Sequence, residues 1–342
     1  MHKKINGFTL VELLITLIIT MTALLVIGET QIQTEQVRRS SQGSQSAQFS
    51  GLMVSQLIDQ GIKKSGYGLN DLTYIGEPIG FFNPQTSTID SEVVTPVLIT
   101  QDGQNSVLRV MWSTSNANVV PVKLLNVKTA TDNVPQVGNT YGMNVGDLLL
   151  YTESGKGAVI HQVSVITPAN EEVEHSISST QPWNSDLTTV YPSGGFTTDA
   201  KIFNLGIWER QEFRIVNNAL LIKRITKDGI TESAVADNVV RFQALYGLDN
   251  GAGSTEADDG VPDIFVSATP TSTADWKRVV AIRFVVVTRN AEIEKNVVTI
   301  NSPSWSGGTF DLSADTNWNK YRYRTYESTV PIRNAVWTVP AS

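Results

Sequence analysis

The sequence predicts an α+β fold, with one long N-terminal helix followed by a mainly antiparallel β head. Three observations support this: an apolar run at residues 8–27, a polar stretch without proline to residue 66, and strand-like segments between turns thereafter. The chain divides accordingly into residues 1–7, a membrane-spanning helical segment 8–27, a helical stem 28–66 and a β-rich head 67–342.

The apolar run from Phe8 to Ile27 is long enough to cross a membrane. Fifteen of its 20 residues are apolar, four are Thr and one is Glu12. About 20 residues, each rising ~1.5 Å, span the ~30 Å hydrocarbon core of a bilayer. Lys3 and Lys4 precede the run, and positive charge at this end predicts a cytoplasmic N-terminus with the rest of the chain exported.

Two kinds of export signal fit this pattern. An ordinary signal peptide would be cut behind Val26-Ile27-Gly28, and the mature chain would lose the helix. Alternatively, the cut falls after Gly7 and the helix is retained. Glu12 favours retention, because a carboxylate inside an apolar helix costs roughly 2.5–3.5 kcal/mol on insertion, and only a retained helix gains a cationic partner for it.

The residues at this junction, Gly7-Phe8-Thr9-Leu10-Val11-Glu12, resemble the class III leader of type IV pilins and pseudopilins. The resemblance implies that residues 1–7 are a prepilin leader, that a prepilin peptidase cuts between Gly7 and Phe8, and that the new Phe8 amine is methylated. It also implies that the Glu12 carboxylate pairs with the Phe8 ammonium of a neighbouring subunit in a fibre. That pairing agrees with the high cost of separate charges in a low dielectric.

The stem is expected to continue the helix as far as Gly66-Tyr67-Gly68, where glycine favours an end. In its second half, apolar residues recur at three- and four-residue steps and are predicted to pack on the head: Phe49, Leu52, Met53, Leu57, Ile58 and Ile62. Residues 31–48 have almost no such stripe, so they are expected to be solvated.

The head contains segments rich in β-branched and aromatic residues, which are typical of strands. The predicted strands are Val107–Trp112, Asp147–Thr152, Ala158–Ile166, Gln211–Val216, Ala219–Thr226, Val239–Tyr246, Arg278–Arg289 and Tyr321–Val330. Asn217-Asn218, between two of them, predicts a two-residue hairpin.

Three head segments are similar to the type IV pilus assembly protein W (PilW) family: Asp237–Gly247, Trp276–Arg283 and Tyr321–Asn334. With the leader, the resemblance implies a minor pilin that helps initiate type IV pilus assembly and forms part of the tip complex, supporting twitching motility, adhesion or DNA uptake. The implied partners are the prepilin peptidase, other minor pilins, the major pilin, the inner-membrane assembly platform and a tip adhesin. The implied location is the inner membrane, with one span and a periplasmic head, and then the pilus at the cell surface.

Two alternatives stay open at this point. A minor pseudopilin of type II secretion, of the J-like kind, shares the leader and the architecture. A secreted β-rich hydrolase or binding protein with an ordinary signal peptide would share only the apolar run and the head.

The sequence carries no motif of an enzyme or of a nucleotide cofactor. It has no Cys, no G-x-S-x-G, no phosphate-binding glycine loop and no dinucleotide fingerprint. The formal charge of −7 disfavours direct binding of nucleic acid. His161 is expected to be a hydrogen-bonded strand residue, and His175 to lie in a solvated, charged loop.

One acidic segment, Asp249–Asp263, is a candidate for Ca²⁺, with oxygen ligands from Asp249, Asp258, Asp259 and Asp263. PilW-like proteins often carry a D-x-(D/N)-x-D-G type of loop here, whereas this chain separates Asp249 and Asn250 from Asp258-Asp259-Gly260 by a spacer whose one charged residue is Glu256. A solvated acidic loop is therefore the alternative, and the chain is expected to need no cofactor.

Overall fold

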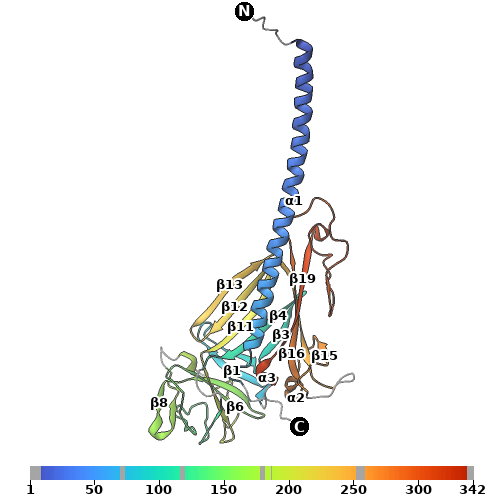
Figure 1. The fold of residues 1–342 in the computed structure, drawn as a ribbon. Coiled ribbons are helices and arrows are strands. Elements are labelled where there is room, and N and C mark those ends of the chain that lie inside the picture. Colours follow the sequence, from blue (N-terminus) through green and yellow to red (C-terminus); the bar gives the residue numbers. More distant parts are fainter. Residues whose placement is uncertain are drawn as a thin grey trace, which may run out of the picture.

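The computed structural model describes residues 9–69, 74–115, 120–177, 182–185, 187–251 and 259–336. A single long helix, α1 (Leu10–Lys64), projects from a β-rich head, and its second half lies along that head (Figure 1). The predicted fold class, a long N-terminal helix before a mainly antiparallel β head, is confirmed.

The ends of α1 follow from local sequence. With 55 residues, the helix is about 82 Å long at 1.5 Å per residue. Lys63 and Lys64 occupy its last turn, where positive charge complements the helix dipole. Gly66 and Gly68 follow with φ of 76° and 81°, which other residues adopt only with strain. The predicted end of the helix at this glycine pair is confirmed.

The face of α1 that packs on the head begins with small residues four positions apart, Gly43, Ala47 and Gly51, and continues with Val54, Ile58, Gly61 and Ile62. The helix backbone can therefore touch the sheet directly. The Thr288 hydroxyl donates to the Ala47 carbonyl over 3.1 Å. A Cβ at Gly51 would lie 2.0 Å from Cε2 of Tyr326 in strand β19 (Tyr323–Pro331).

The predicted apolar stripe of the stem is wrong in part. Ile58 and Ile62 are fully buried, but Phe49 and Leu52 are 71% and 55% exposed. The glycine contacts with β19 fix which side of the helix faces the head, and the two larger side chains fall outside that side. Residues 31–48 are not fully solvated either, because Ser40 donates a hydrogen bond to Glu294 of the head.

Replacing Gly51 with Leu is expected to push α1 away from β19 and to lower the free energy of unfolding by about 1–3 kcal/mol, because the new side chain has no space beside Tyr326. Thermal melting of the full-length protein in detergent measures this. Gly28→Leu is the matched control, since a Cβ there meets nothing within 4 Å. Equal melting temperatures for the two variants would contradict close packing at Gly51.

Two of the head's sheets pack with α1. The five-stranded sheet has the order β13 (Gly229–Asp237), β12 (Ala219–Thr226), β11 (Trp208–Val216), β4 (Asn105–Ser113) and β3 (Val97–Asp102). The four-stranded sheet has the order β15 (Ile264–Val266), β14 (Val239–Leu248), β16 (Val279–Arg289) and β19. Their inner faces meet α1 in one core, where Ile58 and Ile62 join Phe213, Phe242 and Phe284.

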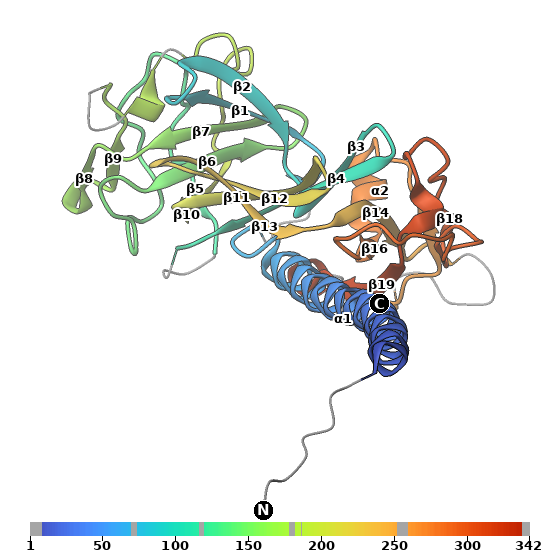
Figure 2. The ribbon, with the colours of Figure 1, turned by 90° about the horizontal axis from the view of Figure 1, so that it is seen from above.

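The third sheet forms a separate part of the head, to one side of α1 and the first two sheets (Figure 2). Its order is β2 (Thr88–Val93), β1 (Pro78–Asn83), β7 (Gly157–Gln162), β6 (Leu148–Glu153), β10 (Lys201–Gly206) and β5 (Val122–Lys123). One hydrophobic cluster, around Trp183 and Trp208, joins it to the five-stranded sheet, and another, around Tyr151 and Phe196, lies on its other side. Within the described residues, β1 and β7 are the one parallel pair of strands.

Short elements complete the described chain. They are the ribbons β8 (Val165–Thr167) with β9 (Glu172–Glu174) and β17 (Ser304–Trp305) with β18 (Gly308–Thr309), the helices α2 (Thr273–Lys277) and α3 (Arg333–Val336), and three 3₁₀ turns at Pro168–Asn170, Pro182–Asn184 and Trp318–Lys320. The predicted strand Ala158–Ile166 is divided, because β7 ends at Gln162 and β8 starts in another ribbon. The Asn217-Asn218 hairpin is confirmed, with φ of 51° and 59° as a type I′ turn requires.

Candidate functional site

The first half of α1 is an uncovered apolar helix. Side chains from Leu10 to Ile27 project away from the head, and none of this apolar stretch is buried within the fold. It is long and apolar enough to cross a membrane, and within the described residues it is the one helix that is. Because so much apolar surface is unfavourable in water, this half of α1 needs lipid or neighbouring helices around it.

The threonines of this segment are compatible with lipid, because their hydroxyls bond to the helix itself. Thr16 donates to the Glu12 carbonyl over 2.8 Å, and Thr20 donates to the Thr16 carbonyl over 2.7 Å. Thr22 donates to the Ile18 carbonyl over 3.0 Å. Each hydroxyl therefore has a partner without water, as a bilayer interior requires.

Glu12 lies in the first turn of α1 and forms a capping box with Thr9. The Thr9 amide donates to Glu12 Oε2 over 3.0 Å, and the Glu12 amide donates to Thr9 Oγ1 over 3.3 Å. Gly7 and Phe8, the predicted cleavage and methylation residues, lie outside the described residues. The carboxylate is thus held beside the backbone of the residue that directly follows Phe8.

A second exposed apolar feature lies on the stem, at Phe49 and Leu52. Both face away from the side of α1 that packs on β19. Sequence spacing alone assigned them to the core, because three- and four-residue steps do not say which of two faces meets the head. The four-residue spacing of Gly43, Ala47 and Gly51 was the signal that could have identified the buried face.

A buried polar cluster lies in the six-stranded sheet. Lys128 has no exposed surface, and its Nζ donates to the Asp132 carbonyl over 2.5 Å. The same Nζ lies 5.7 Å from the ring centres of both Tyr151 and Tyr191, at cation–π distance. Burial lowers the pKa of Lys128 to about 8, although the charge of Asp132 acts in the opposite direction.

His161 and His175 stack in this cluster, with ring centres 4.7 Å apart. His175 Nδ1 donates to the Gln162 carbonyl over 3.0 Å, so its Nε2 accepts from the Tyr151 hydroxyl over 2.6 Å. Both bonds suit a neutral imidazole. Burial, with the charge of Lys128, lowers the pKa of His175 to about 3 and that of His161 well below its ordinary value.

The prediction for His161 is confirmed in part, since it is a buried strand residue whose Nε2 bonds to the Tyr191 hydroxyl, although no hydrogen bond to its Nδ1 is found within the described residues. The prediction for His175 is wrong, because its side chain is buried rather than solvated. The reason is the alternation of β9, in which Glu172 and Glu174 lie nearer the surface while Val173 and His175 point inward.

The acidic segment after β14 is held by hydrogen bonds between its own residues. Asp263 Oδ2 accepts from the amides of Asn250 and Gly251 over 2.7 and 2.6 Å, and Asp249 Oδ2 accepts from the amide of Gly260 over 2.6 Å. Asp258 lies outside the described residues. Within those residues, no group of three or more His, Asp or Glu side chains is placed to hold a metal ion.

Addition of EDTA to the full-length protein in detergent is expected to leave its melting temperature unchanged, because backbone amides already occupy oxygens of Asp249 and Asp263. Differential scanning fluorimetry with and without added Ca²⁺ measures this. A rise in melting temperature with Ca²⁺, reversed by EDTA, would instead support the calcium site.

Residues 2–28 match the prokaryotic N-terminal methylation motif, which covers the exposed apolar stretch at the start of α1. A type IV-like pilin from Thermus thermophilus is similar over 56% of this chain and 86% of its own, at 12% identity and a TM-score of 0.23. No curated protein matches the chain.

Residues 211–334 match the family model of the type IV pilus-assembly protein W. This range runs from β11 to the start of α3, and thus contains the four-stranded sheet on which the stem packs. The six-stranded sheet lies before it. The chain is therefore similar to the type IV pilus-assembly protein W family over residues 211–334 and carries an N-terminal methylation motif, the combination found in a minor pilin of type IV pilus assembly.

Proposed function

We propose that this minor pilin helps to initiate pilus assembly and becomes part of the tip complex. The observation that carries the proposal is the division of α1 into an uncovered apolar half and a half that is fixed to the head. Such a helix is suited first to a bilayer and then to a bundle of similar helices, while the head stays outside. The function is assembly, and it requires no turnover.

The subunit starts in the inner membrane, with one span and a periplasmic head. A prepilin peptidase cuts between Gly7 and Phe8 and methylates the Phe8 amine. In the helix bundle, Glu12 then pairs with the Phe8 ammonium of a neighbouring subunit. The position of Glu12 in the first helical turn supports this step, because a carboxylate and an ammonium in a low dielectric are stable only as a pair.

The partners in this proposal are the other minor pilins, the major pilin, the inner-membrane assembly platform and a tip adhesin. Phe49 and Leu52 support contact with neighbouring subunits, since they extend exposed apolar surface along the stem beyond the membrane segment. Twitching motility, adhesion and DNA uptake follow from the pilus as a whole, because the acidic chain is unsuited to direct DNA binding.

The test is Edman or mass-spectrometric sequencing of the mature N-terminus, with the subunit followed into sheared pili. We expect methylated Phe8 and co-purification with the pilus fraction. A mature chain that starts at Glu29 would overturn the proposal in favour of a secreted protein. Deletion of the gene should abolish surface pili and leave secreted enzymes unchanged, whereas the reverse result would indicate a type II secretion pseudopilin.

A further inference from the structure

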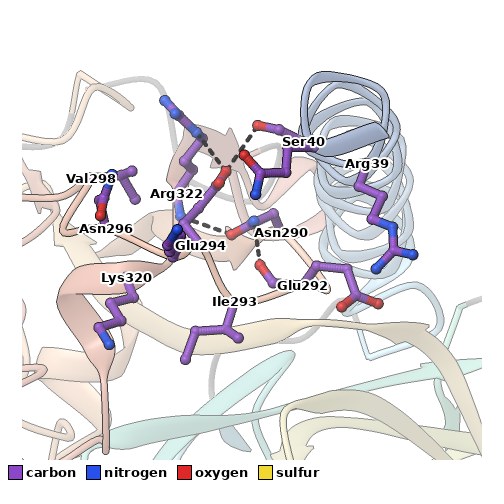
Figure 3. A pocket seen from close by; sticks show the side chains of 12 residues that line it. Arg39, Ser40, Asn290, Glu292, Ile293, Glu294, Asn296, Val298, Lys320 and Arg322 are labelled. Carbon is purple, nitrogen blue, oxygen red and sulfur yellow. Dashed lines mark hydrogen bonds and ion pairs between the residues drawn. The ribbon is translucent and has the colours of Figure 1, made fainter. Parts of the chain in front are cut away.

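A polar groove lies between the middle of α1 and two segments of the head (Figure 3). One segment follows β16, and the other leads into β19. It consists of three adjoining cavities of about 590, 540 and 360 Å³, which all share Arg322 as a lining residue. One wall is α1 from Gln36 to Gln48, and the other comprises residues 290–299 and 320–324. We call it the stem groove.

The walls of the stem groove are tied together by side chains. The Glu294 carboxylate lies between the two walls, and its Oε1 accepts from Ser40 Oγ over 2.9 Å and from Arg322 Nε over 3.1 Å (Figure 3). Arg324 Nη2 donates to Ser44 Oγ over 3.1 Å. The groove is therefore a fixed feature of the fold, because Glu294 and Arg324 of the head both bond to serines of the helix.

Positive charge prevails in the stem groove. Its basic lining residues are Arg39, Lys295, Lys320, Arg322 and Arg324, and its acidic ones are Glu292 and Glu294. Arg39 is paired with Glu35, whose pKa falls to about 2 because Arg38 and Arg39 both donate to it. Within the described residues, neither Lys295 nor Lys320 has a carboxylate within 4 Å, so both are available to a partner.

This charge is opposite to that of the chain as a whole. Loss of Lys3 and Lys4 with the leader changes the formal charge from −7 to −9. The lining residues of the groove sum to +3, so the remainder of the mature subunit is strongly acidic. A neighbouring subunit with a similarly acidic surface would therefore have a charge complementary to that of the groove.

The distance of the groove from the membrane favours a protein, rather than a lipid surface, as its binding partner. Gln36, its first residue on α1, follows Ile27 by nine residues and so lies about 13.5 Å beyond the apolar run. The headgroup layer on one side of a bilayer is only about 5–8 Å deep. Two aliphatic side chains are also exposed here: Ile293, within the wall segment 290–299, and Ile300, directly after that segment, which is 86% exposed.

We propose that the stem groove binds an acidic segment of a neighbouring pilin subunit in the assembled pilus, with Lys295 and Lys320 as the contacting cations. The inference rests on the proposed function, because it presupposes incorporation into a fibre. The groove would add a charged contact, on the membrane-proximal side of the head, to the bundling of the helices. This contact selects neighbouring subunits by the sign of their surface charge.

Charge reversal tests the proposal in cells. The double variant Lys295→Glu/Lys320→Glu is expected to reach the membrane at the wild-type level and to fall about tenfold in sheared pili. Lys123→Glu/Lys277→Glu, on exposed lysines outside the groove, makes the same change in net charge and should incorporate normally. Equal incorporation of both double variants would overturn the inference. If wild type itself is missing from pili, the proposed function fails instead.

Crosslinking then identifies the occupant. Because the chain has no Cys, Asn296→Cys gives a single thiol at the groove for a photoreactive maleimide. We expect an adduct with an identified pilus subunit, through an acidic peptide, that disappears in the Lys295→Glu/Lys320→Glu background. An adduct with phospholipid alone, or no adduct in sheared pili that contain the labelled subunit, would overturn the proposal.

Discussion

Replacement of Glu12 with Gln is expected to leave cleavage after Gly7 intact and to reduce the subunit in sheared pili by at least about tenfold. Gln keeps the size and the hydrogen-bonding capacity that Thr9 uses, so the change removes only the charge. The neighbouring Phe8 ammonium would then stay unpaired in the helix bundle, at a cost of roughly 3–5 kcal/mol. Immunoblots of sheared and cell-bound fractions, with N-terminal sequencing, measure both effects.

Thr16→Val is the matched control for this experiment. It removes a polar group one turn further along the same apolar helix, but the hydroxyl bonds only to its own backbone. It should therefore be processed and incorporated like wild type. Normal incorporation of Glu12→Gln would argue against charge pairing as the assembly step.

The free energy of unfolding is expected to fall by at least about 2 kcal/mol between pH 7 and pH 5. His161 and His175 are neutral in the fold, with lowered pKa values, whereas the unfolded chain takes up protons below about pH 6.5. Each histidine thus stabilises the fold above pH 6.5, and this stability is lost as the pH falls toward the folded pKa, about 3 for His175. A shift of one unit corresponds to ~1.4 kcal/mol, which gives roughly 2 kcal/mol for His175 at pH 5, and the lowered pKa of His161 adds to this loss.

Chemical unfolding of the full-length protein in detergent, followed by Trp fluorescence, measures this loss. Trp183 and Trp208 are buried in the same part of the head and report on it. Lys128 does not contribute in this window, because its pKa of about 8 leaves it charged at both pH values. His161→Phe keeps a ring over His175 and should reduce the dependence on pH to the part that His175 contributes. Equal stability of wild type at pH 7 and pH 5 would contradict the neutral pair.

The parts of the fold that sequence predicted are those with a local cause. The apolar run, the glycine pair after the stem and the Asn217-Asn218 turn each act within a few residues, and all are confirmed. The family match likewise confirms a structural subunit rather than an enzyme. By contrast, the six-stranded sheet depends on the pairing of β1 with β7, strands almost 80 residues apart, for which no local pattern exists.

The candidate sites show the same limit of prediction from sequence, because residues far apart in the chain come together only in the fold. Glu12 could be predicted as a candidate site from sequence because it is a charged carboxylate among apolar neighbours. The buried pair His161 and His175 was missed because the two lie on different strands, and only the fold brings their rings together. The stem groove was missed for the same reason, since Ser40 and Glu294 are separated by 254 positions along the chain.

The glycine-lined contact between α1 and β19 also determines how the subunit carries mechanical load. The contacts from Gly43 to Ile62 are spread along the helix, which runs beside the strand (Figure 1). A pull on the membrane end of α1 therefore acts in shear on all of these contacts at once, rather than peeling them apart singly. The peptide chain joins the head to α1 only at the far end of the helix, so this lengthwise contact is what keeps the head packed against the helix under tension.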